Sequence, residues 1–122
     1  GDGSLEPSRD ERGVAVTLRR VFDGDNVSSA VKPRLDELDR VAAAHPAFAL
    51  AVVVHTDKPV GDAEKAAWNA RATKIADAFK SVPAAKKVVL VAGDAVPLVP
   101  KGAGDRSKNA RVEIVLVAPE AL

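Results

Sequence analysis

The sequence predicts a single α/β domain, an α+β sandwich with elements in the order β-α-β-α-β-β. The 122-residue length suits one domain. Short valine-rich runs are typical of buried strands, and two longer segments carry apolar residues at helical spacing. We expect the first three strands to be parallel and the last, which no helix precedes, to insert antiparallel. The product is a mixed four-stranded sheet with two main helices packed on one face.

Four segments have the apolar patterns of strands. The run from Phe48 to Thr56 is continuously apolar until its end, which predicts a central strand covered on both faces. In the last strand, apolar residues alternate with Glu113 and Val115, which predicts one buried face. The predicted strands are residues 14–22, 48–56, 88–92 and 110–117.

Two segments are predicted helices. Pro33 suits the start of the first, which runs to His45 because Pro46 follows. The second is capped by Asp62 and extends to about Val82, before Pro83. Their apolar stripes consist of Leu35, Leu38, Val41 and Ala42 in the first helix, and of Trp68, Ala72, Ile75, Ala76 and Phe79 in the second.

The segment before the first strand is polar and charged, so it has no face to bury. We therefore predict that residues 1–12 are a flexible linker or a purification remnant, and that residues 13–122 form the domain. The segment between the third and fourth strands holds Gly93, Pro97, Pro100, Gly102 and Gly104, as expected of a loop.

Composition excludes several classes of function. A net charge of +1 and four aromatic residues do not suit nucleic-acid binding. The chain has no cysteine, which excludes disulfides and thiolate metal sites, and no apolar run reaches the ~20 residues of a membrane helix. His55 lacks the spaced ligands of a zinc site and a nucleophile motif, so it is interpreted as structural, bonding the neighbouring backbone. We expect no enzyme activity, cofactor, metal site or membrane segment.

Asp57 and Arg71 are the strongest candidates for a ligand site. Asp57 follows the carboxyl end of a buried strand, where open α/β sheets collect ligands. Arg71 lies at the margin of the second helix's apolar stripe. Together the two charges suit a zwitterionic ligand, with the aspartate taking an ammonium and the arginine a carboxylate. The alternatives are a turn-forming aspartate and an arginine that flanks the helix or makes a structural ion pair.

Several motifs, in order, resemble the OmpA-like carboxyl-terminal domain of outer-membrane proteins and peptidoglycan-associated lipoproteins. The likeness spans about residues 13–117. Val54-His55-Thr56-Asp57 is similar to the family's G-H-T-D, and the helix from Arg71 to Phe79 resembles R-A-x-x-V-x-x-Y-L. The segment from Arg106 to Ile114 resembles R-x-x-N-R-R-V-E-I.

The resemblance implies non-covalent binding of the diaminopimelate-type stem peptide of peptidoglycan, gripped by Asp57 and Arg71. It adds Thr56, Phe22, Asn109 and Arg111 to the expected ligand site. It further implies a periplasmic domain that tethers an envelope assembly to the cell wall, attached to the outer membrane through a region outside this chain. Envelope proteins are possible further partners.

A second hypothesis rests on departures from the family pattern. Val54 replaces the glycine before H-T-D, and the start of the second helix is about one residue shorter, so that Arg71 aligns only with a gap. On this hypothesis the domain is an OmpA-like scaffold for protein interactions that has lost peptidoglycan binding.

Overall fold

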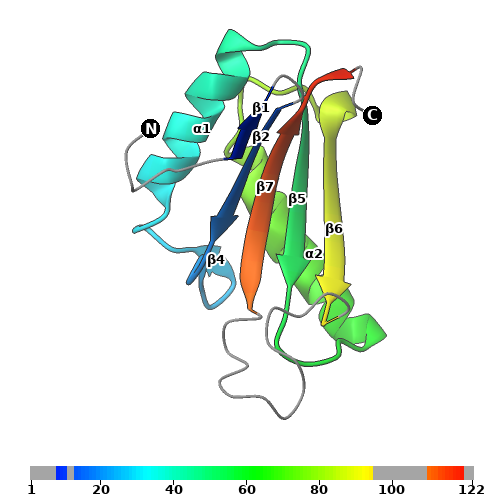
Figure 1. Ribbon diagram of the computed structural model, residues 1–122. Helices are drawn as coiled ribbons and strands as arrows, with labels where there is room; N and C mark the ends of the chain where they lie inside the picture. The colour runs from blue at the N-terminus through cyan, green and yellow to red at the C-terminus, as the bar shows by residue number, and fades with distance from the viewer. Residues whose placement is uncertain (1–7, 11–12, 95–109, 120–122) are drawn as a thin grey trace.

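The computed structural model describes residues 8–10, 13–94 and 110–119 (Figure 1). Four strands precede the first helix, one lies between the two helices and two follow the second, and a short 3-10 turn at Ala84–Lys86 precedes β6. The strands are β1 (Ser8–Asp10), β2 (Gly13–Leu18), β3 (Phe22–Asp23), β4 (Asn26–Val27), β5 (Ala49–His55), β6 (Lys87–Gly93) and β7 (Arg111–Val117). The helices are α1 (Lys32–Ala44) and α2 (Asp62–Asp77).

The main sheet is mixed, with the strand order β1-β2-β7-β5-β6. β7 is antiparallel to both β2 and β5, and β5 is parallel to β6. The strands β2, β5 and β6 therefore point the same way, and their carboxyl ends share one edge of the sheet (Figure 1). This confirms the predicted element order and the antiparallel insertion of the last strand.

The short strand β1 was not predicted. Ser8–Asp10 pairs with Gly13–Ala15 of β2 in a tight antiparallel hairpin, inside the segment expected to be a flexible linker. Strand pairing needs only backbone hydrogen bonds, so a polar segment can join an edge without burying an apolar face. The division into a linker of residues 1–12 and a domain of residues 13–122 stays a prediction.

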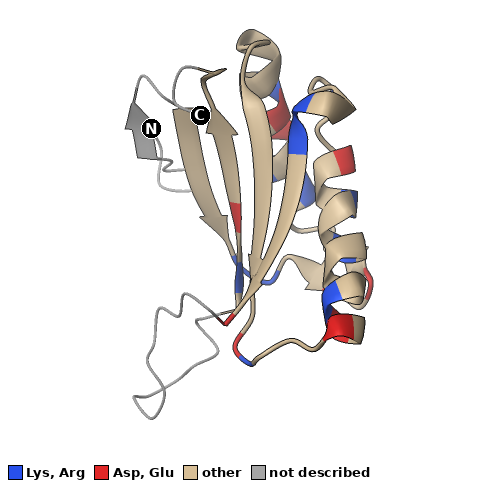
Figure 2. Ribbon diagram, turned by 90° about the vertical axis from the view of Figure 1, so that its right-hand side faces the viewer, with Lys and Arg blue, Asp and Glu red and all other residues tan. Residues whose placement is uncertain are grey.

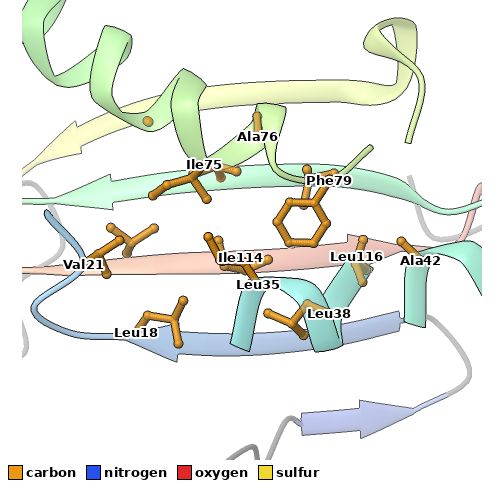
Figure 3. Packing of buried hydrophobic residues seen from close by; sticks show 14 of the residues in the cluster. Leu18, Val21, Leu35, Leu38, Ala42, Ile75, Ala76, Phe79, Ile114 and Leu116 are labelled. Atoms are coloured by element: carbon orange, nitrogen blue, oxygen red, sulfur yellow. The ribbon is translucent and has the colours of Figure 1, made fainter. Parts of the chain in front are cut away.

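The hydrophobic core lies between the sheet and the two helices, which cover the same face (Figures 2 and 3). The alternation predicted for the last strand is confirmed, since Val112, Ile114 and Leu116 are buried. These three lie opposite Val54, Val52 and Leu50 of β5, which are also buried. The helices contribute buried side chains that close the core: Leu35, Leu38, Ala42, Ala72, Ile75 and Ala76.

The other face of the sheet carries no helix among the described residues. Ala51 and Val53 of β5 are only partly buried there, so the expectation of a strand covered on both faces is wrong. A continuous apolar run shows that both faces tolerate apolar side chains, but not that both are covered. On β6, Val88 and Leu90 are 48% and 51% exposed.

Three predicted boundaries need correction. β2 ends at Leu18, and Phe22–Asp23 belongs to a separate hairpin with Asn26–Val27, where Gly24 adopts a φ of 63°. α2 ends at Asp77, and its cap is Gly61, whose N–H donates to the Glu64 carboxylate at 3.5 Å.

The chain beyond Asp77 continues in tight turns instead of helix. The N–H groups of Ala78 and Phe79 donate to carbonyls three residues earlier, as in 3-10 structure. Phe79, the last residue of the predicted apolar stripe, is nevertheless fully buried. None of the described helices combines the length and the apolar character needed to cross a membrane.

Candidate functional site

The candidate site lies where β2 and β5 end and β7 begins. The hairpin β3–β4 follows β2 at this edge, and α2 passes beside it (Figure 1). The chain therefore brings side chains from four separate segments to one end of the sheet, which is the edge at which open α/β sheets bind ligands.

An aromatic and cationic stack joins α2 to the hairpin. The rings of Phe22 and Trp68 meet edge to face, with centroids 5.8 Å apart and an interplanar angle of 62°. The Arg71 guanidinium carbon lies 4.5 Å from the Trp68 ring centroid, within cation–π range. Trp68 therefore contacts both Arg71 on its own helix and Phe22 on the hairpin.

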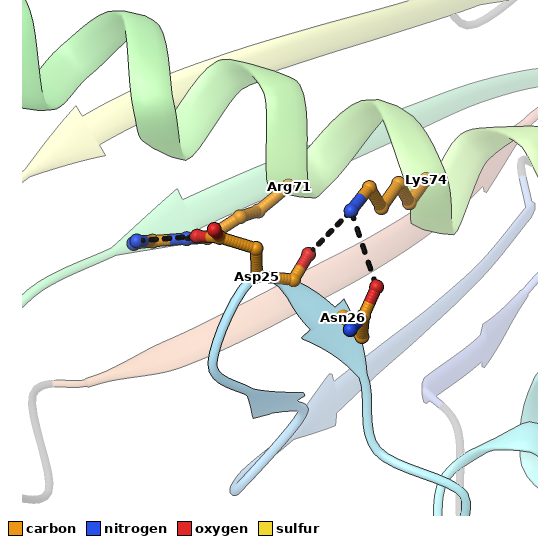
Figure 4. A network of polar contacts seen from close by, with 4 residues as sticks. All are labelled: Asp25, Asn26, Arg71 and Lys74. Atoms are coloured by element: carbon orange, nitrogen blue, oxygen red, sulfur yellow. Dashed lines mark hydrogen bonds and ion pairs between the residues drawn. The ribbon is translucent and has the colours of Figure 1, made fainter.

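Arg71 is also held by the hairpin. Its Nε and Nη2 are both 2.9 Å from Oδ1 of Asp25. Beside it, Lys74 Nζ donates to the Asp25 carbonyl at 2.7 Å and lies 3.3 Å from Asn26 Oδ1 (Figure 4). We call Asp25, Asn26, Arg71 and Lys74 the hairpin cluster, because it fastens the β3–β4 hairpin to α2.

Asp57 and Thr56 occupy the loop directly after β5. The Thr56 N–H donates to the Gly93 carbonyl at 2.8 Å, and its hydroxyl donates to the Lys58 carbonyl at 2.6 Å. These bonds bury Thr56 and fix the start of the loop. Asp57 is half-buried, and its carboxylate forms no ion pair with Arg71 or with any other described residue.

A second polar group, which we call the strand cluster, consists of His55, Arg111 and Glu113. His55 and Arg111 lie opposite each other on β5 and β7 and are 6% and 7% exposed. Glu113 Oε1 is 2.5 Å from His55 Nε2 and 3.9 Å from Arg111 Nη2. The His55 contact has the distance of an ion pair but not the alignment of a hydrogen bond, and Nδ1 has no hydrogen-bond partner among the described residues.

A cavity of about 180 Å³ opens between the two clusters. Trp68 and Phe22 form apolar walls, while His55 and Arg111 supply polar groups from the strands. Among the described residues, the ionisable side chains that line the cavity are those of Arg20, His55 and Arg111, and none is acidic. The full lining is Arg20, Val21, Phe22, Val54, His55, Trp68, Ala110, Arg111 and Val112.

The structure brings some of the predicted site residues together. Phe22 and Arg111 line the same cavity, and Arg71, which is not part of the lining, contacts the lining residue Trp68. Thr56 follows His55 directly but is engaged in backbone hydrogen bonds. Asn109 lies outside the described residues. The membership of all six residues in a ligand site therefore stays a prediction.

Three residues of this region were not predicted to take part. Trp68 was assigned to the core stripe and Glu113 to the outer face of the last strand, and Asp25 was not a candidate for the site. His55 was expected to bond the neighbouring backbone, whereas it contacts the Glu113 side chain. The Asp25–Arg71 pair joins residues 46 positions apart, so no local sequence pattern predicts it.

Comparison with known proteins finds likeness in solved structures only. No family model and no curated protein matches the chain. The structure of the cell wall anchor of the T6SS from Pseudomonas aeruginosa is 20% identical, with a TM-score of 0.72 over 93% of this chain and 87% of that one.

Two further structures show the same likeness. The peptidoglycan-associated lipoprotein from Burkholderia pseudomallei is 19% identical, with a TM-score of 0.64 over 87% of this chain and 90% of that one. The OmpA-like domain of FopA1 from Francisella tularensis is 17% identical, with a TM-score of 0.64 over 94% of this chain and 80% of that one. At these identities the likeness is one of fold.

Proposed function

We propose that this domain, which has the OmpA-like fold, binds peptidoglycan non-covalently through the diaminopimelate-type stem peptide and tethers an envelope protein to the cell wall. Two of the similar structures are described as a cell wall anchor and a peptidoglycan-associated lipoprotein, which supports a role at the wall. The proposal places the domain in the periplasm, attached to the outer membrane through a region outside this chain. It assigns no catalytic step, cofactor or metal.

The charges at the site suit a zwitterionic headgroup. Within the described part of the chain, no cation pairs with the half-buried carboxylate of Asp57, which suits it to accept an ammonium group. A guanidinium has five N–H donors, and Asp25 takes two of those of Arg71, which leaves donors for a ligand carboxylate. Each charged hydrogen bond is worth about 1.5–3 kcal/mol, so one site binds reversibly.

The position of Trp68 carries the proposal. Its ring holds the Arg71 guanidinium and lines the same cavity as His55, which lies two residues before Asp57. Arg71 contacts one residue of this lining and Asp57 follows another closely in the chain, which supports the proposal that one ligand reaches both charges. The aromatic walls of the cavity suit the aliphatic part of a diamino acid, because they remove its methylene groups from water.

Sedimentation with purified sacculi tests this proposal. We expect the wild-type domain to sediment with sacculi of the diaminopimelate type, and Asp57→Asn and Arg71→Gln each to lower the bound fraction at least about tenfold, because each removes one charged contact. The matched controls Asp36→Asn and Arg34→Gln change the same charges at exposed positions of α1 and should bind as the wild type does.

Equal sedimentation of wild type, Asp57→Asn and Arg71→Gln would overturn the site assignment. Sacculi with lysine in place of diaminopimelate test the headgroup, since lysine lacks the second carboxylate at the end of its side chain. Undiminished binding to the lysine type would contradict recognition of the zwitterionic end.

A second candidate function is a scaffold for envelope proteins that has lost wall binding. The observation that favours it is the pairing of Arg71 with Asp25, which engages the arginine without Asp57. A wild-type domain that fails to sediment with either type of sacculus, yet co-purifies with an envelope protein, would support the scaffold over the peptidoglycan-binding module.

A further inference from the structure

Strand β6 forms one edge of the main sheet (Figure 1). It pairs with β5 on one side, and no described strand pairs with its other side. The backbone N–H and C=O groups along that outer side are a template for another strand. At the opposite edge, β1 is only three residues long, so β6, with seven, is the longer template.

The side chains of β6 leave this edge unprotected. Proteins usually guard an edge strand with charges, proline or a bulge. In β6 the only charged residue is Lys87, at the start, and the register irregularity against β5 comes near the end, at Val54/His55. Between these points Val88 and Leu90 are about half exposed on the helix-free face. In the middle of the strand, the outer backbone groups therefore have no strand partner in the described ranges, and apolar side chains are exposed beside them.

We propose that a second copy of this chain pairs with β6, strand against strand and antiparallel, to make one continuous sheet across a twofold axis. The charges at the two ends of β6 favour a second copy as the partner and an antiparallel direction of pairing. Lys87 begins the strand and Asp94 follows it, so antiparallel pairing brings Lys87 of each copy beside Asp94 of the other. Parallel pairing brings like charges together. A twofold contact needs only one self-complementary surface.

The symmetry also fixes the register. In a twofold antiparallel pair, the residue on the axis faces its own copy. With Leu90 on the axis, the most exposed large apolar side chain of the chain's described part packs against itself, and Val88 lies opposite Ala92. Lys87 then lies opposite Gly93, and Asp94 is the next residue along the partner strand. Centring on Val89 moves Lys87 away from Asp94 and leaves Leu90 off the axis.

Charge substitutions at Leu90 test the proposal by sedimentation velocity over a range of concentrations. We expect the wild type to form a dimer, and Leu90→Lys and Leu90→Glu each to raise the dimer Kd at least about 100-fold, because like charges then face each other. An equimolar mixture of the two variants should dimerise again, since Lys and Glu meet on the axis. Leu90 is half exposed, so the fold tolerates both changes, which circular dichroism checks.

Thr17→Lys is the control, and this variant should remain dimeric. Thr17 is exposed on the helix-free side of β2, away from the β6 edge. A monomeric wild type, dimeric Leu90 charge variants, or a mixture that stays monomeric would each overturn the proposal. Binding to sacculi is measured separately, so failure of this inference and failure of the proposed function are distinguishable.

Discussion

The strand cluster and the hairpin cluster lie at the same end of the sheet and use similar charged groups in different surroundings. His55 and Arg111 are almost fully buried on paired strands, whereas the side chains of Arg71 and Asp25 are 25% and 76% exposed. Exposed ion pairs contribute at most about 1 kcal/mol, while a buried charge that loses its partner costs several times more. We infer that the strand cluster fixes the sheet and that the hairpin cluster can exchange its partner for a ligand.

The largest predicted effect is on the strand cluster. Glu113→Gln keeps the size of the side chain but removes the anion that both His55 and Arg111 face. We expect the free energy of unfolding, measured with urea, to fall by about 2 kcal/mol. Glu37→Gln, an exposed position on α1, is the matched control and should change it by less than about 0.5 kcal/mol. Equal urea midpoints for wild type and Glu113→Gln would remove the contrast between the clusters.

An intermediate effect is predicted for Trp68, whose ring contacts Arg71 of the hairpin cluster. Trp68→Leu removes the ring that Arg71 lies on but keeps an apolar side chain. We expect a loss of about 1 kcal/mol in stability, together with weaker sedimentation with sacculi. Trp68→Phe retains a ring and should preserve most of both. If Trp68→Leu lowers stability but leaves binding unchanged, the Trp68 ring contributes to packing and not to ligand binding.

The smallest predicted effect concerns Asp25. Because its pair with Arg71 is exposed, Asp25→Asn should cost at most about 0.5 kcal/mol in low salt. The difference from wild type should vanish near 1 M salt, where screening acts within about 3 Å. Binding to sacculi should rise, since the Arg71 guanidinium loses its ion pair with Asp25 and becomes available to a ligand. A fall in binding would instead make Asp25 part of the ligand site.

Much of the fold was predictable because local patterns report burial. The alternation in the last strand, from Val112 to Leu116, identified the face that packs on the helices. The absence of a helix before that strand predicted its antiparallel direction, which the pairing of β7 with β2 and β5 confirms. Boundaries were less accurate, since the bend after Leu18 and the tight turns after Asp77 depend on contacts with the rest of the core.

The candidate site was predictable only in outline. The position of Asp57 after β5 follows from the apolar run that precedes it, but the partner of Arg71 depends on how the hairpin folds back onto α2. Gly24, with a φ of 63°, forms the turn of this hairpin, and the direction in which Asp25 points follows from that fold. The ion-pair contact of His55 with Glu113 likewise requires the strand pairing, in which β5 and β7 are more than fifty residues apart in the chain.

The central place of β7 has a consequence for how the protein is made. This strand is the last along the described chain, yet β2 and β5 both pair with it and not with each other. Until the segment that forms β7 is available, β2 cannot join the paired strands β5 and β6, and the apolar faces of these strands stay exposed. Pairings this distant in sequence form slowly and leave intermediates prone to aggregation. The nascent chain is therefore expected to need a chaperone until that segment is available.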